Sequence, residues 1–351
     1  MVTKKIILPA CIAIGLVISS SSVSASTKFY DVDDSHWASK AIYEYAEKGY
    51  LLETGTPYFY PNQAITRAEA LALLAIVKNV TLDAKVNLNA QDLPKNHKYY
   101  NEVRKMVELG IIDNATYINP NQPLKRCELA KILAKGFKVE VDSVNRTKFS
   151  DYDRTFWAKD FIESLADAGL VNGVGNNQFE PNRFVTNAEM VSLLSRFEKF
   201  KQREANYEIA YDFMKKDYID TINQYASLVN EMMYLTNVER EKHGLPLLAH
   251  DHALSQIAII KARDMVDQRY FNHKSPVYGE PWNMAMLFDY SFVRFAENLG
   301  RYQKNPYDVV SQWMKSKEHQ ANMLNPNYTK MGGGICVTNR NEYYWVQMFS
   351  G

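Results

Sequence analysis

The C-terminal third of the chain contains three titratable side chains that could act together: His273, Glu297 and His319. Two imidazoles and a carboxylate suit a divalent transition metal, above all Zn²⁺ with one position left to water. A single histidine is more often structural than a ligand, and these three residues lie far apart in the sequence. The sequence therefore shows that suitable groups exist, and we expect them to share a cleft.

A second candidate chemistry is anion binding at two helix starts. Arg67 and Arg126 each directly follow the residue expected to cap a helix. A helix start is a poor place for a cation, because the macrodipole is already positive there. Either each arginine pairs with a local carboxylate, or it is held for an anion that the free backbone amides would also favour. Both interpretations remain open on physical grounds.

These arginines belong to a sequence motif, called the phrase below, that occurs three times at intervals of about 60 residues. The first copy comprises Phe29-Tyr30-Asp31-Val32, Trp37-Ala38, Tyr58-Phe59-Tyr60-Pro61 and Thr66-Arg67-Ala68-Glu69. The third comprises Phe149-Ser150-Asp151-Tyr152, Trp157-Ala158, Gln178-Phe179-Glu180-Pro181 and Thr186-Asn187-Ala188-Glu189. The middle copy keeps Tyr117-Ile118-Asn119-Pro120 and Lys125-Arg126-Cys127-Glu128. A unit of this length cannot bury its own apolar face, so the copies are expected to stack.

Each copy predicts a helix, a loop and a second helix. In the first copy, Ser35 is expected to cap a helix that carries Trp37 on one face and ends at Gly49. The second helix should begin at the Thr-x-x-Glu capping box of Thr66 and Glu69. These two residues are explained by satisfying backbone amides, without any ligand.

The remainder of the chain predicts a connector and a mixed domain. Residues 201–227 fall within a long stretch that has neither Gly nor Pro, which favours a largely helical, semi-rigid connector. Beyond it, apolar residues at helical spacing predict a helix from His252 to Asp267. Met331–Val337 and Tyr343–Phe349 are typical of closing strands. Helices followed by strands indicate an α/β sandwich.

The first 25 residues are typical of an export signal. Lys4-Lys5 precede an apolar run from Ile6 to Ile18, and Val23-Ser24-Ala25 resembles a cleavage site. An uncleaved anchor is the alternative, but the apolar run is short for a membrane span. After cleavage we expect no transmembrane anchor. The remaining Cys127 and Cys336 are expected to be buried thiols rather than a disulfide framework.

Composition narrows the partners. With 351 residues the chain is expected to form two or more domains, and 46% hydrophobic with 23% charged residues is typical of globular proteins. The net charge is +1, and outside the N-terminus no dense Lys/Arg run occurs. Binding to nucleic acid needs a clustered basic face, so we do not expect a nucleic-acid partner.

The repeated phrase resembles the S-layer homology (SLH) domain, in a tandem of three over roughly residues 28–200. The resemblance implies an all-α pseudo-trimer of helix-loop-helix repeats around a central bundle. It also implies grooves that bind secondary cell-wall polymer, often through pyruvylated sugars whose carboxylates suit an arginine. By position, the residues that would contact this polysaccharide are Arg67, Arg126, Asp31, Asp151, Trp37 and Trp157.

Two departures from the SLH pattern bear on this expectation. Asn187 replaces the arginine in the third copy, and Lys98 to Tyr100 fall where the second copy should have Trp-Ala. Fewer than three working grooves are therefore expected.

The C-terminal segment resembles a bacterial CAP domain, of the cysteine-rich secretory, antigen 5 and pathogenesis-related superfamily. The resemblance rests on Phe271-Asn272-His273, Ala296-Glu297-Asn298-Leu299 and a motif from Trp313 to Pro326 that contains His319. It implies an α-β-α sandwich with two His and two acidic residues around a cleft, where some members bind zinc. His273, Glu297 and His319 match three of the four positions, and Ser316 stands at the fourth, where eukaryotic relatives carry Glu.

These expectations combine into one organisation. Residues 1–25 would be a signal peptide, 28–85, 86–145 and 146–200 three SLH repeats, 201–227 the connector and 228–351 the CAP domain. The protein would be secreted and held non-covalently at the cell wall or S-layer surface, presenting a CAP domain that binds an unknown ligand. The alternative is a wall-anchored, metal-dependent hydrolase, with metal held by His273 and His319 and with Glu297 as general base.

Overall fold

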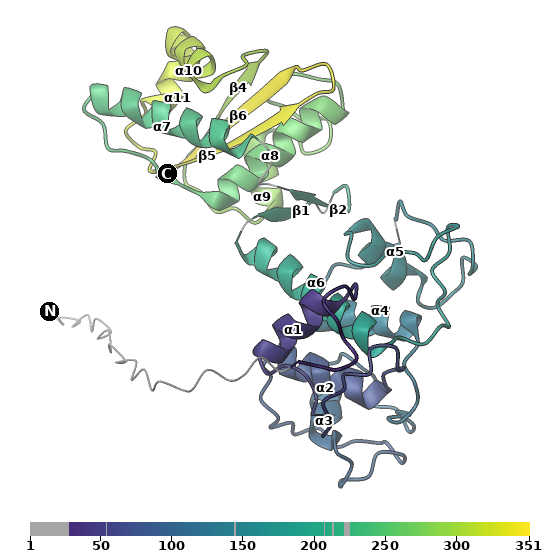
Figure 1. The fold of residues 1–351 in the computed structure, drawn as a ribbon. Helices are drawn as coiled ribbons and strands as arrows, with labels where there is room; N and C mark the ends of the chain where they lie inside the picture. The colour runs from purple at the N-terminus through teal and green to yellow at the C-terminus, as the bar shows by residue number, and fades with distance from the viewer. Residues whose placement is uncertain (1–27, 54, 144, 207, 213, 221–224) are drawn as a thin grey trace, which may run out of the picture.

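The computed structural model describes residues 28–53, 55–143, 145–206, 208–212, 214–220 and 225–351. Within them the chain forms two lobes, joined by one long helix and a short β-hairpin (Figure 1). The predicted export segment, residues 1–25, lies outside the described residues. In the described ranges, no helix is long and apolar enough to cross a bilayer.

The N-terminal lobe is built from six helices. They are α1 (Ser39–Glu47), α2 (Arg67–Val77), α3 (Tyr100–Glu108), α4 (Arg126–Phe137), α5 (Lys159–Asp167) and α6 (Asn187–Ala205). The predicted capping box is present at α2, where the Thr66 hydroxyl accepts from the Glu69 amide and the Glu69 carboxylate accepts from the Thr66 amide. Thr186 and Glu189 do the same at α6.

The prediction for the start of the first helix is wrong. The α1 helix begins three residues later than a cap at Ser35 would place it, because the Ser35 amide and hydroxyl both bond to Asp33 in a local turn. Trp37 consequently precedes the helix and is 65% exposed. The helix ends as predicted, with Gly49 at a φ of 68°.

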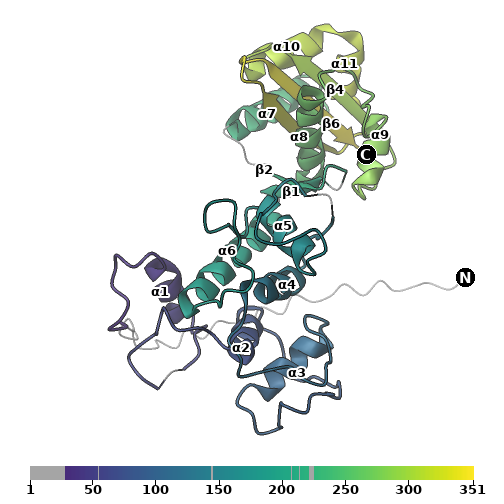
Figure 2. The same ribbon diagram turned by 90° about the vertical axis from the view of Figure 1, so that its right-hand side faces the viewer.

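The segments that precede α2, α4 and α6 are hydrogen-bonded in a closed cycle. The Ile65 amide donates to the Val185 carbonyl, the Val185 amide to the Leu124 carbonyl, and the Leu124 amide to the Ile65 carbonyl, each at 2.9 Å. Behind this cycle, α1 packs on α6, α3 on α2 and α5 on α4 (Figure 2). One hydrophobic core contains residues of all three copies, so the copies are stabilised by each other.

The prediction of a helical connector over residues 201–227 is wrong for its central part. After α6 ends, β1 (Ile209–Asp212) and β2 (Asp217–Asp220) form an antiparallel hairpin. Lys216 takes the left-handed conformation, with φ of 54°, so the turn forms without the Gly or Pro that would have indicated it. Along β2 the more buried and less buried residues alternate, as expected for a strand with one covered face.

The hairpin is fastened to both lobes. Asp217 accepts two hydrogen bonds from Arg146 of the N-terminal lobe, at 2.7 and 3.1 Å, and one from Arg263 of the C-terminal lobe at 3.3 Å. The buried Asp212 carboxylate accepts from the Tyr278 hydroxyl, and Lys215 pairs with the buried Asp264 at 3.3 Å. The hairpin is therefore a joint between the lobes rather than a free tether.

The C-terminal lobe places helices on both faces of a four-stranded sheet. Its strands are β3 (Ala249–His250), β4 (Phe295–Arg301), β5 (Lys330–Val337) and β6 (Tyr343–Ser350), in the order β3-β5-β6-β4. Its helices are α7 (Ala226–Lys242), α8 (His252–Asp267), α9 (Pro281–Leu287), α10 (Pro306–Lys315) and α11 (Lys317–Met323). The predicted helix from His252 to Asp267 and both closing strands are confirmed.

Three consecutive glycines let the two helix layers approach the sheet closely. A Cβ atom on Gly332 or Gly334 would lie 2.4 Å or less from the backbone of α8, at Ser255 and Ile259 respectively. A Cβ atom on Gly333 would point to the other face, 2.5 Å from the Met232 side chain of α7. The sandwich of helix, sheet and helix therefore depends on the absence of side chains here.

Candidate functional site

Arg67 and Arg126 occupy equivalent positions between copies of the repeat. The Arg67 guanidinium lies 3.2 Å from the Glu128 carboxylate, which belongs to the next copy. Arg126 lies 3.8 Å from the Glu189 carboxylate, and its planar group stacks on the Phe179 ring at 4.5 Å. The two interpretations of the arginines are thus compatible, since each has a local carboxylate and each lines a cavity.

The two cavities differ in what surrounds the arginine. The Arg67 cavity, of about 90 Å³, is lined also by Asp113, Glu128, Lys131 and Trp157. The Arg126 cavity is only about 30 Å³, since Arg126 donates to the carbonyls of Phe179 and Asn172 at 2.9 and 3.0 Å. Arg67 is consequently the more open of the two, although its Nε atom is buried without a hydrogen-bond partner in the described residues.

The two tryptophans lie on the surface. Trp157 is 53% exposed and joins Arg67 in one cavity, although the two residues come from the third and first copies. Trp37 is also exposed, but it does not line the Arg126 cavity. A guanidinium can bind a carboxylate through two parallel hydrogen bonds, and an aromatic ring beside it offers an apolar face.

Asp31 and Asp151 have a different role in the geometry. The two carboxylate oxygens of Asp31 accept from the amides of Phe59 and Tyr60, at 2.9 and 2.7 Å. The Asp151 carboxylate accepts in the same way from Phe179 and Glu180. Their oxygens are used by backbone amides, so both aspartates shape loops in which Tyr60 and Glu180 have positive φ.

Asp92 makes the same contacts in the middle copy and was missed by the sequence reasoning. Its carboxylate accepts from the Ile118 and Asn119 amides at 2.9 and 2.7 Å. The pattern that could have found it is its position 27 residues before Asn119, since Asp31 precedes Tyr60 at a similar spacing.

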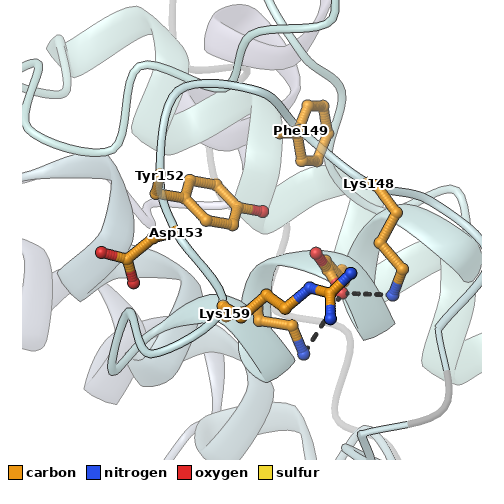
Figure 3. A pocket seen from close by; sticks show the side chains of 7 residues that line it. Lys148, Phe149, Tyr152, Asp153 and Lys159 are labelled. Atoms are coloured by element: carbon orange, nitrogen blue, oxygen red, sulfur yellow. Dashed lines mark hydrogen bonds and ion pairs between the residues drawn. The ribbon is translucent and has the colours of Figure 1, made fainter.

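A separate cavity of about 550 Å³ lies within the third copy (Figure 3). The Glu163 carboxylate, only 2% exposed, pairs there with Lys148 at 2.8 Å and Lys159 at 3.6 Å. In the first copy the same helical position holds Tyr43, whose ring stacks on Phe29. The two lysines neutralise a buried charge of the protein itself, so this cavity needs no ligand to account for its cations.

In the C-terminal lobe, His273 and Glu297 are brought together. The Nδ1 atom of His273 lies 2.8 Å from Oε1 of Glu297, which is in β4 with its side chain 1% exposed. Burial raises the pKa of Glu297 above its ordinary value, against the hydrogen bond from His273 and the charge of Lys261. Oε2 of Glu297 is buried and has no hydrogen-bond partner in the described residues.

Lys261 is a buried cation beneath this pair that the sequence reasoning treated only as part of a helix. Its ammonium donates to the carbonyls of Asn272 and His273, at 2.9 and 2.6 Å, and to the Tyr270 hydroxyl at 3.1 Å. Burial lowers the pKa of Lys261, opposed by the charge of Glu297. The lysine fixes the backbone that carries His273 and so positions the imidazole.

His319 lies on α11, half-buried and near enough to His273 for their charges to interact. Burial, followed by the repulsion from His273, lowers the pKa of His319. Ser316 is half-buried at the junction of α10 and α11, where its backbone carbonyl accepts from the Gln320 amide and its side chain makes no capping bond. Ser316 therefore provides no carboxylate at the fourth position of the cleft.

A chain of buried amides holds α11 against the sheet, and the sequence reasoning missed it. The Asn298 side chain donates to the His319 carbonyl at 3.2 Å and accepts from the Asn322 side chain at 2.9 Å. Asn298 and Gln347 are both fully buried, and Gln347 donates to Thr236 of α7 at 2.8 Å. Asn298 thereby sets the position of the His319 backbone relative to Glu297.

The residues expected to hold zinc do not fit a metal site. In the described part of the chain, no group of three or more His, Cys, Asp or Glu side chains is arranged to hold a metal ion. Glu297 is turned to Nδ1 of His273 and Ser316 stands in place of a carboxylate, so the described cleft offers two imidazoles without a third converging donor.

Comparison with known proteins matches both parts of the chain. Residues 233–349 match the cysteine-rich secretory protein family (CAP), and residues 28–71 and 148–191 match the S-layer homology domain. An uncharacterized protein of Bacillus subtilis, YkwD, is 42% identical over 121 residues, which is 34% of this chain and 46% of that protein. The S-layer protein sap of Bacillus anthracis is 28% identical over 202 residues, 56% of this chain and 24% of that protein.

Among solved structures, an extracellular protein with an SCP domain from Bacillus anthracis is 27% identical, with a TM-score of 0.33. That likeness covers 38% of this chain and 45% of that one. The chain spans less than half the length of each of these relatives. A CAP domain and two S-layer homology domains are thus found in this chain, with the middle copy of the phrase outside the matched residues.

Proposed function

We propose that the chain is an exported cell-surface protein, anchored non-covalently to a secondary cell-wall polysaccharide by three SLH repeats. The cyclic hydrogen bonds between the three copies support the assignment of the middle copy as a repeat and the pseudo-trimer that it implies. The two S-layer homology matches and the S-layer relatives support the location at the cell wall.

One observation carries the anchoring function. Arg67 of the first copy, Glu128 of the second and Trp157 of the third line the same groove. A guanidinium beside an aromatic face can hold a pyruvylated sugar, through its carboxylate and through its ring. Arg126 provides a second such cation, and Trp37 a second exposed aromatic face. Asp31 and Asp151 support the loops beside these grooves.

The test is retention of the full chain on purified cell-wall sacculi. The double variant Arg67→Ala, Arg126→Ala should be retained about a hundredfold less than wild type, since each of the two lost charged hydrogen bonds is worth about 1.5 kcal/mol. The matched control is Arg294→Ala with Arg340→Ala, two exposed arginines of the C-terminal lobe. Equal retention of wild type and the Arg67/Arg126 variant would remove the proposal.

For the CAP domain we propose a binding role centred on His273 and His319. Glu297 is buried against His273, so it is placed to orient the imidazole rather than to contact an external water. This geometry favours binding over the alternative, a metal-dependent hydrolase with Glu297 as general base. Zinc binding by equilibrium dialysis, with His273→Ala as control, separates the two. One tightly bound zinc ion per chain that is lost in the variant would favour the hydrolase over the binding role.

A further inference from the structure

The two departures from the repeat phrase meet in one groove. Lys98 stands where the first and third copies have Trp37 and Trp157, and Asn187 stands where the other copies have arginine. Although they come from different copies, Lys98 and Asn187 line the same cavity, of about 310 Å³. Glu53, Tyr60, Glu69 and Tyr99 also line this cavity.

Lys98 and Asn187 lie in the same cavity because of the way the three copies are arranged. The Arg67 groove combines the helix-start residue of one copy, the capping glutamate of the next and the tryptophan of the third, namely Arg67, Glu128 and Trp157. The same rotation applied to the third copy gives Asn187, Glu69 and Lys98. One groove therefore collects both changes, and we name it the Lys98 groove.

The Lys98 groove has a different balance of charge. In the arginine grooves the capping glutamates are paired, Glu128 with Arg67 at 3.2 Å and Glu189 with Arg183 at 2.6 Å. Asn187 cannot replace that pairing, because its amide donates to the carbonyls of Phe59 and Tyr60 at 3.4 and 3.0 Å.

The Glu69 carboxylate accordingly accepts hydrogen bonds from uncharged donors of the protein. It accepts from the Thr66 amide and hydroxyl at 2.9 and 2.7 Å, and among the described residues it makes no ion pair within 4 Å. Lys98 reaches instead toward the Glu53 carbonyl at 3.5 Å and lies 5.0 Å from the centre of the Tyr99 ring. The groove therefore holds two carboxylates, Glu53 and Glu69, against one ammonium.

We propose that the Lys98 groove binds an uncharged sugar unit of the wall polymer, whereas the arginine grooves take carboxylate-bearing units. A carboxylate ligand would face the Glu69 and Glu53 charges. Sugar hydroxyls, in contrast, can donate to Glu69 and accept from Lys98. Tyr60 and Tyr99 supply aromatic faces on which a sugar ring can pack. This inference rests on the proposed wall-polymer function.

The test uses saturation-transfer NMR on the full chain with two probes, N-acetylglucosamine and glucuronate. Wild type should bind both. Arg67→Ala with Arg126→Ala should lose glucuronate and keep N-acetylglucosamine. Asn187→Arg, which restores the cation of the other copies and can pair with Glu69, should weaken N-acetylglucosamine about tenfold, the effect of one lost charged hydrogen bond. Circular dichroism and the melting temperature of each variant verify folding.

Three results would overturn the inference. The first is loss of both sugars together in the Arg67/Arg126 variant, which places the uncharged sugar in the arginine grooves. The second is unchanged N-acetylglucosamine binding in Asn187→Arg, which places it elsewhere. The third is binding of glucuronate and sacculi by wild type without N-acetylglucosamine, which leaves the anchoring function intact. If wild type binds neither sugar nor sacculi, the anchoring function fails together with the inference.

Discussion

Arg67 and Glu128, residues of two different repeats, lie 3.2 Å apart as an ion pair. A carboxylate-bearing ligand that binds Arg67 must therefore compete with Glu128. Because both side chains are about a quarter to a third exposed, the pair is worth little in water. It acts as a weak internal competitor rather than as a structural bond.

Replacing Glu128 by Gln should strengthen binding to a carboxylate-bearing polymer. Gln keeps the acceptor for the Lys125 amide at the start of α4 but removes the competing charge. The expected gain is about 0.5 kcal/mol, or roughly twofold in affinity for sacculi. Glu239→Gln is the matched control, because Glu239 pairs with Lys242 on the C-terminal lobe and lines none of the proposed grooves. A loss of affinity in Glu128→Gln would show that Glu128 itself contacts the polymer.

The buried pair in the CAP domain predicts a pH dependence. The folded-state pKa of Glu297 is raised by burial, so its contribution to stability is present below the ordinary value of 4.5 and is lost as pH rises through the raised pKa. Glu297→Gln keeps an acceptor for His273 without the charge. The melting temperature of this variant should exceed that of wild type by a few degrees at neutral pH, with the gap closing toward roughly pH 4.

The pH dependence of stability at His319 should be opposite to that at Glu297. Burial and His273 lower the pKa of His319, so its contribution is present above the ordinary value of 6.5 and is lost as pH falls through the lowered pKa. His319→Asn should therefore lessen the loss of stability on acidification. Thermal unfolding of both variants, followed by circular dichroism between roughly pH 4 and pH 9, measures the two effects. A gap that does not change with pH would contradict the assignment.

The glycines of β5 provide a test of the sandwich. Gly334→Ala would place a methyl group 2.3 Å from the backbone of α8 at Ala258 and Ile259, and backbone cannot easily move aside. The expected cost is about 3 kcal/mol in the free energy of unfolding. Gly333→Ala is the matched control, because its methyl group meets the flexible Met232 side chain. Urea unfolding that ranks the two variants equally would contradict this packing.

The hairpin between the lobes predicts coupling through Asp217. Asp217→Asn removes the charge shared by Arg146 and Arg263, which should weaken the joint by about 1–2 kcal/mol. Small-angle X-ray scattering should then show a broader distribution of lobe separations. Lys242→Ala removes an exposed cation of α7 that pairs with Glu239, and serves as control. Identical scattering from wild type and Asp217→Asn would mean that the ion pairs do not hold the lobes.

The parts of the fold that could be predicted from sequence are those governed by local periodicity. The helix from His252 to Asp267 and the capping box of Thr66 and Glu69 depend on residues a few positions apart, so their pattern is visible in the chain. The hairpin was not predicted because its turn uses Lys216 in the left-handed conformation instead of glycine. A lack of Gly and Pro was therefore a misleading indication of helix.

The candidate sites divide in the same way. The equivalence of Arg67 and Arg126 can be seen in the sequence. The glutamate that pairs with each arginine, however, depends on how the three copies pack against one another. The pairing of His273 with Glu297 is likewise long-range, and the buried Lys261 and Asn298 become visible only once the helices are packed. Asp31 and Asp151 show the converse, since a motif position proved to hold backbone amides.

Because the β1–β2 hairpin is bonded to both lobes, a force applied to the C-terminal lobe is transmitted to the N-terminal lobe instead of extending a flexible linker. Tension would pass through Asp217 into Arg146 of the third copy, and from there into the cycle that joins all three. The C-terminal lobe would consequently keep a fixed orientation relative to the ligand of the N-terminal lobe. A shear force would be distributed over all three repeats instead of detaching the third repeat first.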